Sequence, residues 1–480
     1  MNFTIFGHEF PECVKPARYR TMQGIIWSCL ATIFACTWVS MHPNVPDPRF
    51  SAWQRLCERF KLLFYALTGP ELVAVWAYRQ KMMATKYAKY YNDHFKLNPP
   101  SRPKCKRFSI EWSRSKWQGS KEWFPSKWQG IKEWFRPSEK RKAREYDRAW
   151  TTTHGFLFEM QGLECFQDGR PLAIQPYYPD ENPSFSLPEL VGRTAVVCHP
   201  RQLLHQFDIS EEEIKDKSKG DGFTKFVAIC QTLWFMIQCI ARWVTHLHVT
   251  DLEVVTLAFT FANIMIYCLW WNKPQNMTMA IRVDRPDSRD QENKIGSGPN
   301  SVAQQTVDRT WFFRIAHFLS FLASFVMIIG MDSGSYISPE ARIRFYTSDK
   351  KGNQSRRVAF MTSVVGMVFG GVHLIPLWLS SFPSFRKKRL WIMSTIIIIY
   401  VPLGFANVSW VVRRLLRQLR YPPSTVPHRT SFLLTTMTVV MWFYYISCRS
   451  ILIYLAFDNL RFLPPDAFLN VEWSTYFPHI

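Results

Sequence analysis

Eight apolar runs determine what this chain can fold into. Each run reaches or approaches the length of about 18 residues that an α-helix needs to cross the hydrocarbon core of a bilayer. A lone segment can span that core only when its backbone hydrogen bonds close within it, which favours helices. We therefore predict an all-α, polytopic membrane protein with about eight transmembrane helices. The runs are residues 24–41, 60–77, 226–249, 252–271, 311–331, 359–379, 390–412 and 431–457.

The second run carries a carboxylate near its centre. Gly69, Pro70 and Glu71 interrupt the sequence FKLLFYALTGPELVAVWA. Proline breaks the helical hydrogen-bond ladder, and an ionised Glu within lipid costs about 2.5–3.5 kcal/mol on insertion scales. A chain that keeps a carboxylate there buries it in a helix bundle or in a cavity. Glu71 is therefore a candidate catalytic acid, and a structural ion pair with Arg449 of the eighth run is the alternative.

The chain is strongly basic, with a formal net charge of +22. The positive charges lie mostly between the apolar runs, so membrane lipid is the predicted partner and nucleic acid is not. The eleven cysteines have no CxxC or paired spacing, which predicts neither a metal site nor a disulfide framework, and no cofactor is predicted. We expect a multi-pass protein of the endoplasmic reticulum or another endomembrane. A cytosolic N-terminus would make Asn353, in the sequon NQS, lumenal and a glycosylation site.

Composition divides the chain into five segments. Residues 1–80 hold the first two helices, residues 81–150 are a basic insertion with 19 Lys/Arg against 7 Asp/Glu, and residues 151–222 form a small extramembrane segment. Residues 223–458 hold the other helices, and residues 459–480 are a C-terminal tail. The insertion contains a Trp-rich tandem repeat of 11 residues, SKWQGSKEWFP followed by SKWQGIKEWFR. This repeat is either an element of the membrane interface or a duplication in a tolerant loop.

Two further acids and a group of aromatic residues complete the candidate site. Asp251 and Glu253 lie between the third and fourth runs, where they are either reacting acids or N-terminal residues of a helix. Five aromatic residues gather on these two runs, and a cavity lined by them would stabilise a cation by about 0.5–2 kcal/mol per ring. Ordinary packing and lipid contact are the alternative for these rings. With Arg449, the predicted substrate-binding residues are Trp234, Trp243, Tyr267, Trp270 and Trp271.

Several longer motifs occur together along the chain. They are THGF at 153–156, ISEEEIKDKSKGD at 209–221, WWNKP at 270–274 and LPPDAFLNVEWSTYFPHI at 463–480. With these motifs the chain resembles a large family of fungal multi-pass integral membrane proteins, most of them without an assigned activity. The resemblance implies an α-helical membrane protein and little chemistry. The number of runs and the placement of acids are also broadly similar to fungal membrane-bound terpenoid and meroterpenoid cyclases.

Two kinds of function fit this sequence. The first is a cyclase or isomerase of fungal secondary metabolism that protonates an apolar isoprenoid substrate and holds the carbocation while it cyclises. Glu71 or Asp251 would donate the proton, and Glu253 would support it. The second is a non-enzymatic transporter, channel or receptor, in which Glu71 at a proline-broken helix marks a substrate or proton path. Whether the protein is an enzyme, and its oligomeric state, stay open.

Overall fold

Helices dominate the part of the chain that the structure, a computed structural model, describes. The described residues are 4–5, 8–9, 19–46, 50–95, 149–167, 170–176, 195–198, 209–218, 222–282, 355–379, 382–418 and 428–471. Within them, five helical segments are long and apolar enough to cross a membrane, as expected of a multi-pass protein. These are Met22–Val39, Lys225–Val244, Asp251–Trp270, Arg357–Trp378 and Val440–Phe462. The run at 311–331, the repeat at 115–136 and Asn353 lie outside the described residues.

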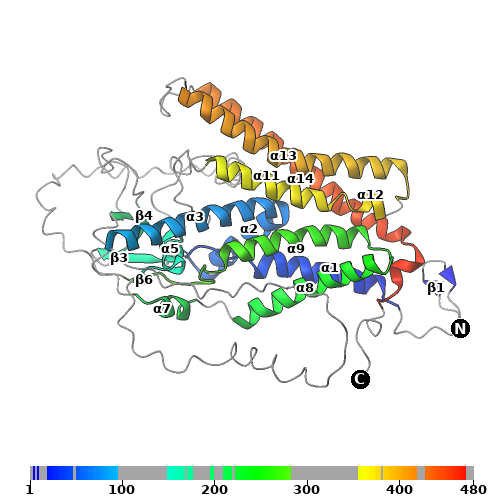
Figure 1. The fold of residues 1–480 in the computed structure, drawn as a ribbon, viewed down its shortest axis with the longest axis horizontal. Helices are drawn as coiled ribbons and strands as arrows, with labels where there is room; N and C mark the ends of the chain where they lie inside the picture. The colour runs from blue at the N-terminus through cyan, green and yellow to red at the C-terminus, as the bar shows by residue number, and fades with distance from the viewer. Residues whose placement is uncertain are drawn as a thin grey trace, which may run out of the picture.

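The long helices form one bundle around α9 (Figure 1). About two thirds of the α9 span is buried (67%), against 33% for the segment that begins with α1 and 28% for α8, so α9 is the innermost of the three. The helices of the bundle are α1 (Met22–Phe34) with its π-helical extension η2 (Ala35–Val39), α2 (Ala52–Thr68), α3 (Pro70–Phe95), α8 (Gly222–Val244), α9 (Asp251–Trp270), α11 (Ser355–Val372), α12 (Pro376–Leu379), α13 (Phe385–Gln418) and α14 (His428–Asp458).

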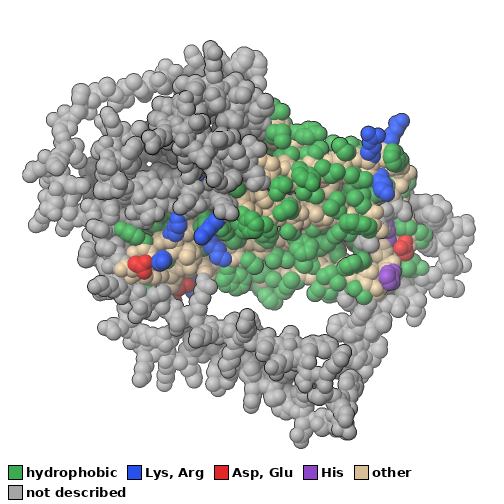
Figure 2. Space-filling view, turned by 45° about the horizontal axis from the view of Figure 1, so that its top comes forward, with side chains coloured by type: hydrophobic (Ala, Val, Ile, Leu, Met, Phe, Trp, Pro, Cys, Tyr) green, Lys and Arg blue, Asp and Glu red, His purple; other side chains and the backbone are tan. Residues whose placement is uncertain are grey.

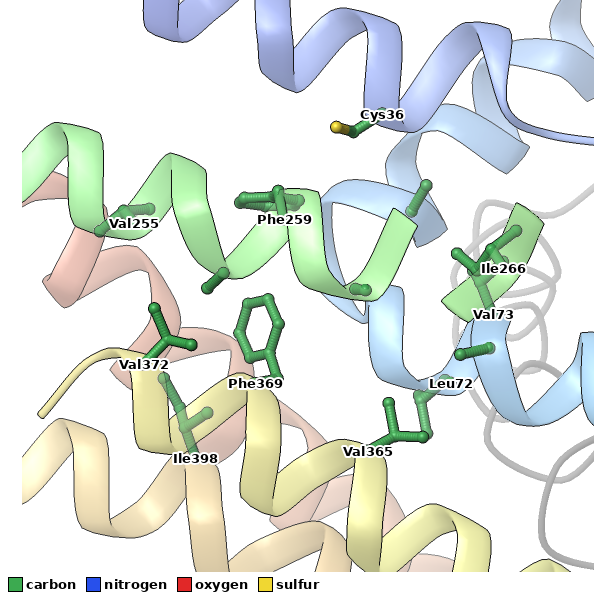
Figure 3. Packing of buried hydrophobic residues seen from close by; sticks show 14 of the residues in the cluster. Cys36, Leu72, Val73, Val255, Phe259, Ile266, Val365, Phe369, Val372 and Ile398 are labelled. Atoms are coloured by element: carbon green, nitrogen blue, oxygen red, sulfur yellow. The ribbon is translucent and has the colours of Figure 1, made fainter. Parts of the chain in front are cut away.

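The core of the bundle is apolar and lies between α9, α11 and the start of α3. Phe259 of α9 meets Phe369 of α11 edge to face, with ring centroids 5.8 Å apart (Figure 3). Gly370 of α11 allows α13 to approach closely, because a Cβ at this position would lie 2.4 Å from Ile399. Such close backbone contact is how helices associate in lipid, where the solvent supplies no hydrophobic driving force.

The outer surface of the bundle is apolar as well. Figure 2 shows a broad band of hydrophobic side chains over the described helices, with charged side chains gathered toward its two ends. Trp27, Phe34, Trp243 and Tyr400 are among the exposed residues, each more than half accessible. A water-soluble monomer rarely exposes so much contiguous apolar surface, whereas a bilayer covers it.

The second predicted span, residues 60–77, is not one straight helix. The chain bends by 111° between α2 and α3, because Gly69 ends α2 and Pro70 cannot continue its hydrogen-bond ladder. Arg59 before the bend donates to Asn276 (3.0 Å), and Gln80 after it accepts from Trp270 (3.0 Å). Trp270 is the last residue of α9 and Asn276 lies in the chain that directly follows it, so residues 59–80 enter and leave the bundle at the same end. We call residues 59–80 the re-entrant hairpin.

An extramembrane layer covers that end of the bundle. Helix α5 (Thr152–Glu159) packs against the C-terminal half of α3, which extends beyond the hairpin, and α7 (Glu211–Asp216) packs on α5. A four-stranded mixed sheet adds β structure to the expected all-α chain, in the order β5-β4-β3-β6. The antiparallel β3–β4 pair is flanked by parallel neighbours on both sides. Its strands are β3 (Leu163–Gln167), β4 (Arg170–Pro176), β5 (Ala195–Cys198) and β6 (Ile281–Arg282).

The opposite end of the bundle joins the two ends of the chain. After α14 the chain forms the short 3₁₀ turns η4 (Asn459–Phe462) and η5 (Pro465–Phe468), and Leu469 then pairs with Tyr19 just before α1. Arg242 at the end of α8 donates to four carbonyls, those of His248, Asp466, Ala467 and Leu469. This arginine therefore ties the described part of the predicted tail to the turn between α8 and α9.

Candidate functional site

Glu71 is completely buried at the tip of the re-entrant hairpin and is paired with two residues of α14. Tyr445 donates its hydroxyl to Glu71 Oε1 at 2.6 Å, and Arg449 Nη1 donates to Glu71 Oε2 at 3.2 Å. Arg449 Nη1 also donates to the Tyr445 hydroxyl at 3.0 Å. The three polar groups close a triangle inside the apolar bundle, and the ion pair that the sequence suggested for Arg449 is present.

Local sequence explains how these groups reach one another. Pro70 begins α3, which places Glu71 in the first turn, where the helix dipole favours a negative charge. Tyr445 and Arg449 are four residues apart and therefore lie on one face of α14. Trp442 stacks on Tyr445 with ring centroids 5.4 Å apart and contacts the bend, because a Cβ at Gly69 would lie 3.0 Å from its ring. The bend is thus packed directly against α14.

Arg449 is only partly satisfied. Its guanidinium carbon lies 4.2 Å from the Phe369 ring centroid and 5.2 Å from that of Phe259, which supplies cation–π attraction. Its Nε and Nη2 are buried and have no hydrogen-bond partner among the described residues. Buried donors without acceptors cost free energy, so this arginine retains hydrogen-bonding capacity that Glu71 and Tyr445 do not use.

Glu253 has a structural role in the helix start. Thr250 and Glu253 form a reciprocal capping box at the N-terminus of α9, and Arg20 binds both carboxylate oxygens of Glu253. These contacts stabilise the N-terminus of α9 or join it to the chain just before α1. The alternative that the sequence left open, a first-turn acid at a helix N-terminus, describes Glu253.

Asp251 differs from its neighbour because it borders a cavity. The cavity has a volume of about 150 Å³ and lies between the α8–α9 turn and the end of α14. Asn459 donates its amide to Asp251 Oδ2 at 2.6 Å. Glu71 pairs with the middle of α14 and Asp251 contacts the turn that follows it, so the predicted acids do not share one site.

The five aromatic residues differ in burial. Tyr267 and Trp270 of α9 are buried, whereas Trp234, Trp243 and Trp271 are 48%, 61% and 71% exposed. Trp234 and Trp243 are exposed because α8 lies at the periphery of the bundle, and Trp271 is exposed where the chain leaves the C-terminus of α9. The three exposed tryptophans do not support one enclosed aromatic pocket on the third and fourth runs.

Lys273 is a buried charged residue to which the sequence alone assigned no role. Lys273 Nζ donates to the His42 carbonyl (2.5 Å), Asn44 Oδ1 (3.1 Å) and Gln80 Oε1 (2.8 Å). The rings of Trp76 and Trp270 lie 4.9 and 4.6 Å away. Burial lowers the pKa of Lys273 well below its usual range, and the carboxylate of Glu159 opposes that shift.

All three ammonium donors of Lys273 have acceptors, so we interpret it as a junction between α9, the chain after α1 and the re-entrant hairpin. Its position in the motif WWNKP, directly after an apolar run, was the one sequence signal for it.

Comparison with known proteins identifies a similar family whose function is unknown. The chain matches a family of unknown function, DUF8562, over residues 10–124 and 201–293. These two ranges cover less than half of the chain and include the re-entrant hairpin, α8, α9 and Lys273. No curated protein and no solved structure matches the chain.

Proposed function

We propose that this protein is a non-enzymatic membrane transporter in which the re-entrant hairpin and Arg449 form the translocation site. The observation that carries the proposal is the position of Glu71 within the bundle, at the tip of a hairpin whose two arms leave at one end. Re-entrant and broken helices are tolerated at membrane depth only where protein buries them or water reaches them. In transporters such helices carry the substrate and ion sites near the middle of the bilayer.

The ion pair between Glu71 and Arg449 provides a two-state element. With Glu71 ionised, its carboxylate holds α3 against α14 through Arg449 and Tyr445. A proton on Glu71 removes the charge attraction, and the hairpin tip can then separate from α14. Arg449, with two unused buried donors, is the group available to an anionic or carbonyl-bearing solute. Proton entry and solute binding are thereby linked at one position.

The cyclase hypothesis has less support from the geometry. Protonation of an isoprenoid requires an acid that borders an apolar cavity, and small-molecule sites have volumes of roughly 300–1,000 Å³. Glu71 is fully enclosed, and the cavity beside Asp251 is only about 150 Å³. Microsomes that carry the protein can be incubated with a farnesylated phenol. A product formed by the wild-type chain and not by Glu71→Gln would support the cyclase hypothesis.

For the whole chain we propose that seven of the eight predicted runs cross an endomembrane, with Asn353 on the lumenal side. The five segments within the described residues and the apolar runs at 311–331 and 390–412 make up these seven, and the eighth predicted run is the re-entrant hairpin. Glycosidase treatment of the expressed protein tests the orientation, because a shift in mobility that Asn353→Gln abolishes requires a lumenal site.

Proton flux into liposomes tests the proposed function. The full-length protein is reconstituted with an internal pH indicator, the membrane potential is clamped with potassium and valinomycin, and the external medium is acidified. We expect faster acidification than in protein-free liposomes. Glu71→Gln should slow the protein-dependent flux about tenfold or more, which corresponds to about 1.4 kcal/mol of added barrier.

Glu58→Gln is the matched control. Glu58 lies on α2 directly before the hairpin and pairs with Lys61, so the control removes one carboxylate near the hairpin but away from its tip. Its flux should equal that of the wild type. Wild-type flux equal to that of empty liposomes, or equal fluxes for wild type and Glu71→Gln, would overturn the proposal.

A further inference from the structure

A run of basic residues begins α13 at the end of the bundle opposite the extramembrane layer. The sequence RKKR occupies residues 386–389, directly after Phe385, the first residue of the helix. Lys387 pairs with Asp458, the last residue of α14, at 2.5 Å, which holds this turn against the end of α14. Figure 2 shows basic side chains at the right-hand end of the apolar band, the end at which α12 lies in Figure 1. The run therefore lies where the bundle leaves the membrane core.

The other cations of this run face away from the bundle. The ion pair with Asp458 directs Lys387 toward α14. Because successive residues of an α-helix are rotated by about 100°, its three basic neighbours lie on the outward half of the helix. We call these neighbours, Arg386, Lys388 and Arg389, the basic turn. All three are exposed, and none forms a hydrogen bond or an ion pair within the part of the chain that the structure describes. Their charges are therefore available to a ligand.

Apolar side chains continue the outward face of α13 toward the middle of the membrane. Met393, Ile396 and Tyr400 follow Arg389 at intervals of three or four residues, and all of them are exposed on the outer surface. With a rise of about 1.5 Å per residue, Arg389 lies about 6 Å along the helix from Met393. Phe385 is also exposed, and aromatic rings are enriched where a bilayer meets water. The basic turn thus lies at headgroup depth, directly beyond side chains that contact acyl chains.

We propose that the basic turn is a docking surface for the headgroup of an anionic phospholipid. Arg386 and Arg389 are three residues apart and are neighbours on the helix surface. Guanidinium groups bind phosphate oxygens in pairs, so these two arginines would hold the lipid phosphate, while Lys388 would attract the additional negative charge of the headgroup. The acyl chains would lie along Met393 and Tyr400.

Two features of the surface favour this occupant. A zwitterionic headgroup brings a cation of its own to the basic turn, so phosphatidylcholine should bind less well than an anionic lipid. An acidic protein would match the charges and would leave the apolar stripe at Met393, Ile396 and Tyr400 unused, whereas a phospholipid matches both parts. This docking surface is separate from the proposed translocation site and does not depend on it.

Photocrosslinking from position 385 tests the docking surface. The full-length protein, with p-benzoylphenylalanine in place of Phe385, is reconstituted into vesicles of phosphatidylcholine and phosphatidylserine, and the adducts are identified by mass spectrometry. We expect the proportion of phosphatidylserine to phosphatidylcholine among the adducts to exceed that of the vesicle about fivefold or more. Phosphatidylglycerol in place of phosphatidylserine should be enriched to a similar extent, because the surface recognises negative charge. Arg386→Gln combined with Arg389→Gln should return the adducts to the vesicle composition.

Lys89→Gln combined with Lys217→Gln is the matched control. Both lysines are exposed, on the C-terminal half of α3 and directly after α7, so the control removes the same charge at the other end of the bundle. It should leave the enrichment unchanged, and Arg386→Lys combined with Arg389→Lys, which keeps the charge, should retain most of it. Adducts with the vesicle composition in the parent protein would overturn the proposal. Equal enrichment in the parent and the double glutamine variant at the basic turn, or adducts to a second protein chain in place of lipid, would also overturn it.

Discussion

Arg449 reaches across 378 residues of sequence to donate to Glu71, and the two residues are 4% and 0% exposed. An intramembrane carboxylate and an intramembrane guanidinium each carry a large insertion cost alone. Pairing them, with the Tyr445 hydroxyl as a third member, lowers that cost and fixes where the tip of the re-entrant hairpin lies against α14.

Removal of one partner should therefore be worse than removal of both. We expect Glu71→Leu and Arg449→Leu each to destabilise the protein by about 3–5 kcal/mol, because each leaves an unpaired buried charge. The double variant should recover most of the lost stability, because two leucine side chains can pack in an apolar bundle without leaving a buried charge. Unfolding in detergent, followed by a double-mutant cycle, measures the coupling, and strictly additive losses would contradict the pairing.

Gly155 should tolerate no side chain. A Cβ there would lie 2.0 Å from the carbonyl oxygen of Ala84, so α5 could not pack on α3 without a backbone shift. We expect Gly155→Ala to cost about 1–3 kcal/mol or more. Gly371→Ala is the matched control, because no atom lies within 4 Å of a Cβ at that helical position, and it should stabilise by up to about 1 kcal/mol. Equal effects of the two substitutions on the unfolding midpoint would refute the close contact.

Acid should destabilise the junction around Lys273 through His42. The pKa of His42 is lowered from 6.5 to about 3, first because the ring is buried and second because Lys225 and Lys273 lie nearby, while its hydrogen bond to the Ser40 carbonyl opposes the shift. The stabilisation is complete above pH 6.5 and is lost as the pH falls toward 3, by about 1.4 kcal/mol per pH unit.

His42→Asn provides the comparison for this pH dependence. Asparagine keeps a donor for Ser40 and does not titrate, so the variant should lose less stability than the wild type between pH 6.5 and pH 4. Unfolding midpoints measured against pH in detergent give this difference. Parallel curves for the two proteins would show that His42 remains protonatable in the folded state.

The tryptophans of α8 and α9 should differ in what they contribute. Trp270 is fully buried, donates to Gln80 and packs on Trp76 with ring centroids 4.9 Å apart. Trp270→Ala should therefore lower the free energy of unfolding by about 3–5 kcal/mol. Trp243 is 61% exposed on the outer surface, and Trp243→Ala should change the stability by less than about 0.5 kcal/mol. The unfolding midpoints of the two variants in detergent check this, and a large loss for Trp243→Ala would mean that it packs against another part of the chain.

The predictions that the structure confirmed depend on neighbours in sequence. Residues 252–271 were predicted to be a span, and α9 runs from Asp251 to Trp270, because apolar length and a Thr250–Glu253 capping box both act within a few residues. The bend at Pro70 is local in the same way, since proline removes a donor from its own helix. The expected partnership of Glu71 and Arg449 followed from charge balance in lipid.

Hydropathy alone could not distinguish a span from a re-entrant hairpin. Residues 60–77 have enough apolar length for either, and the choice depends on Arg59, Gln80 and Lys273 meeting the same end of α9. Likewise, the five aromatic residues were assigned to one cavity because they share two helices, whereas burial depends on which face of α8 meets the bundle.

By itself, the sequence determined that this chain is helical and apolar enough for a membrane, and that it keeps a carboxylate at a proline break. Those properties follow from the backbone ladder and from transfer free energies, which are sums over adjacent residues. Only the tertiary structure decided that Glu71 is paired and enclosed, that Glu253 caps a helix, and that Asp251 borders a cavity. Those outcomes depend on groups brought together from distant parts of the chain, whose positions no local energy specifies.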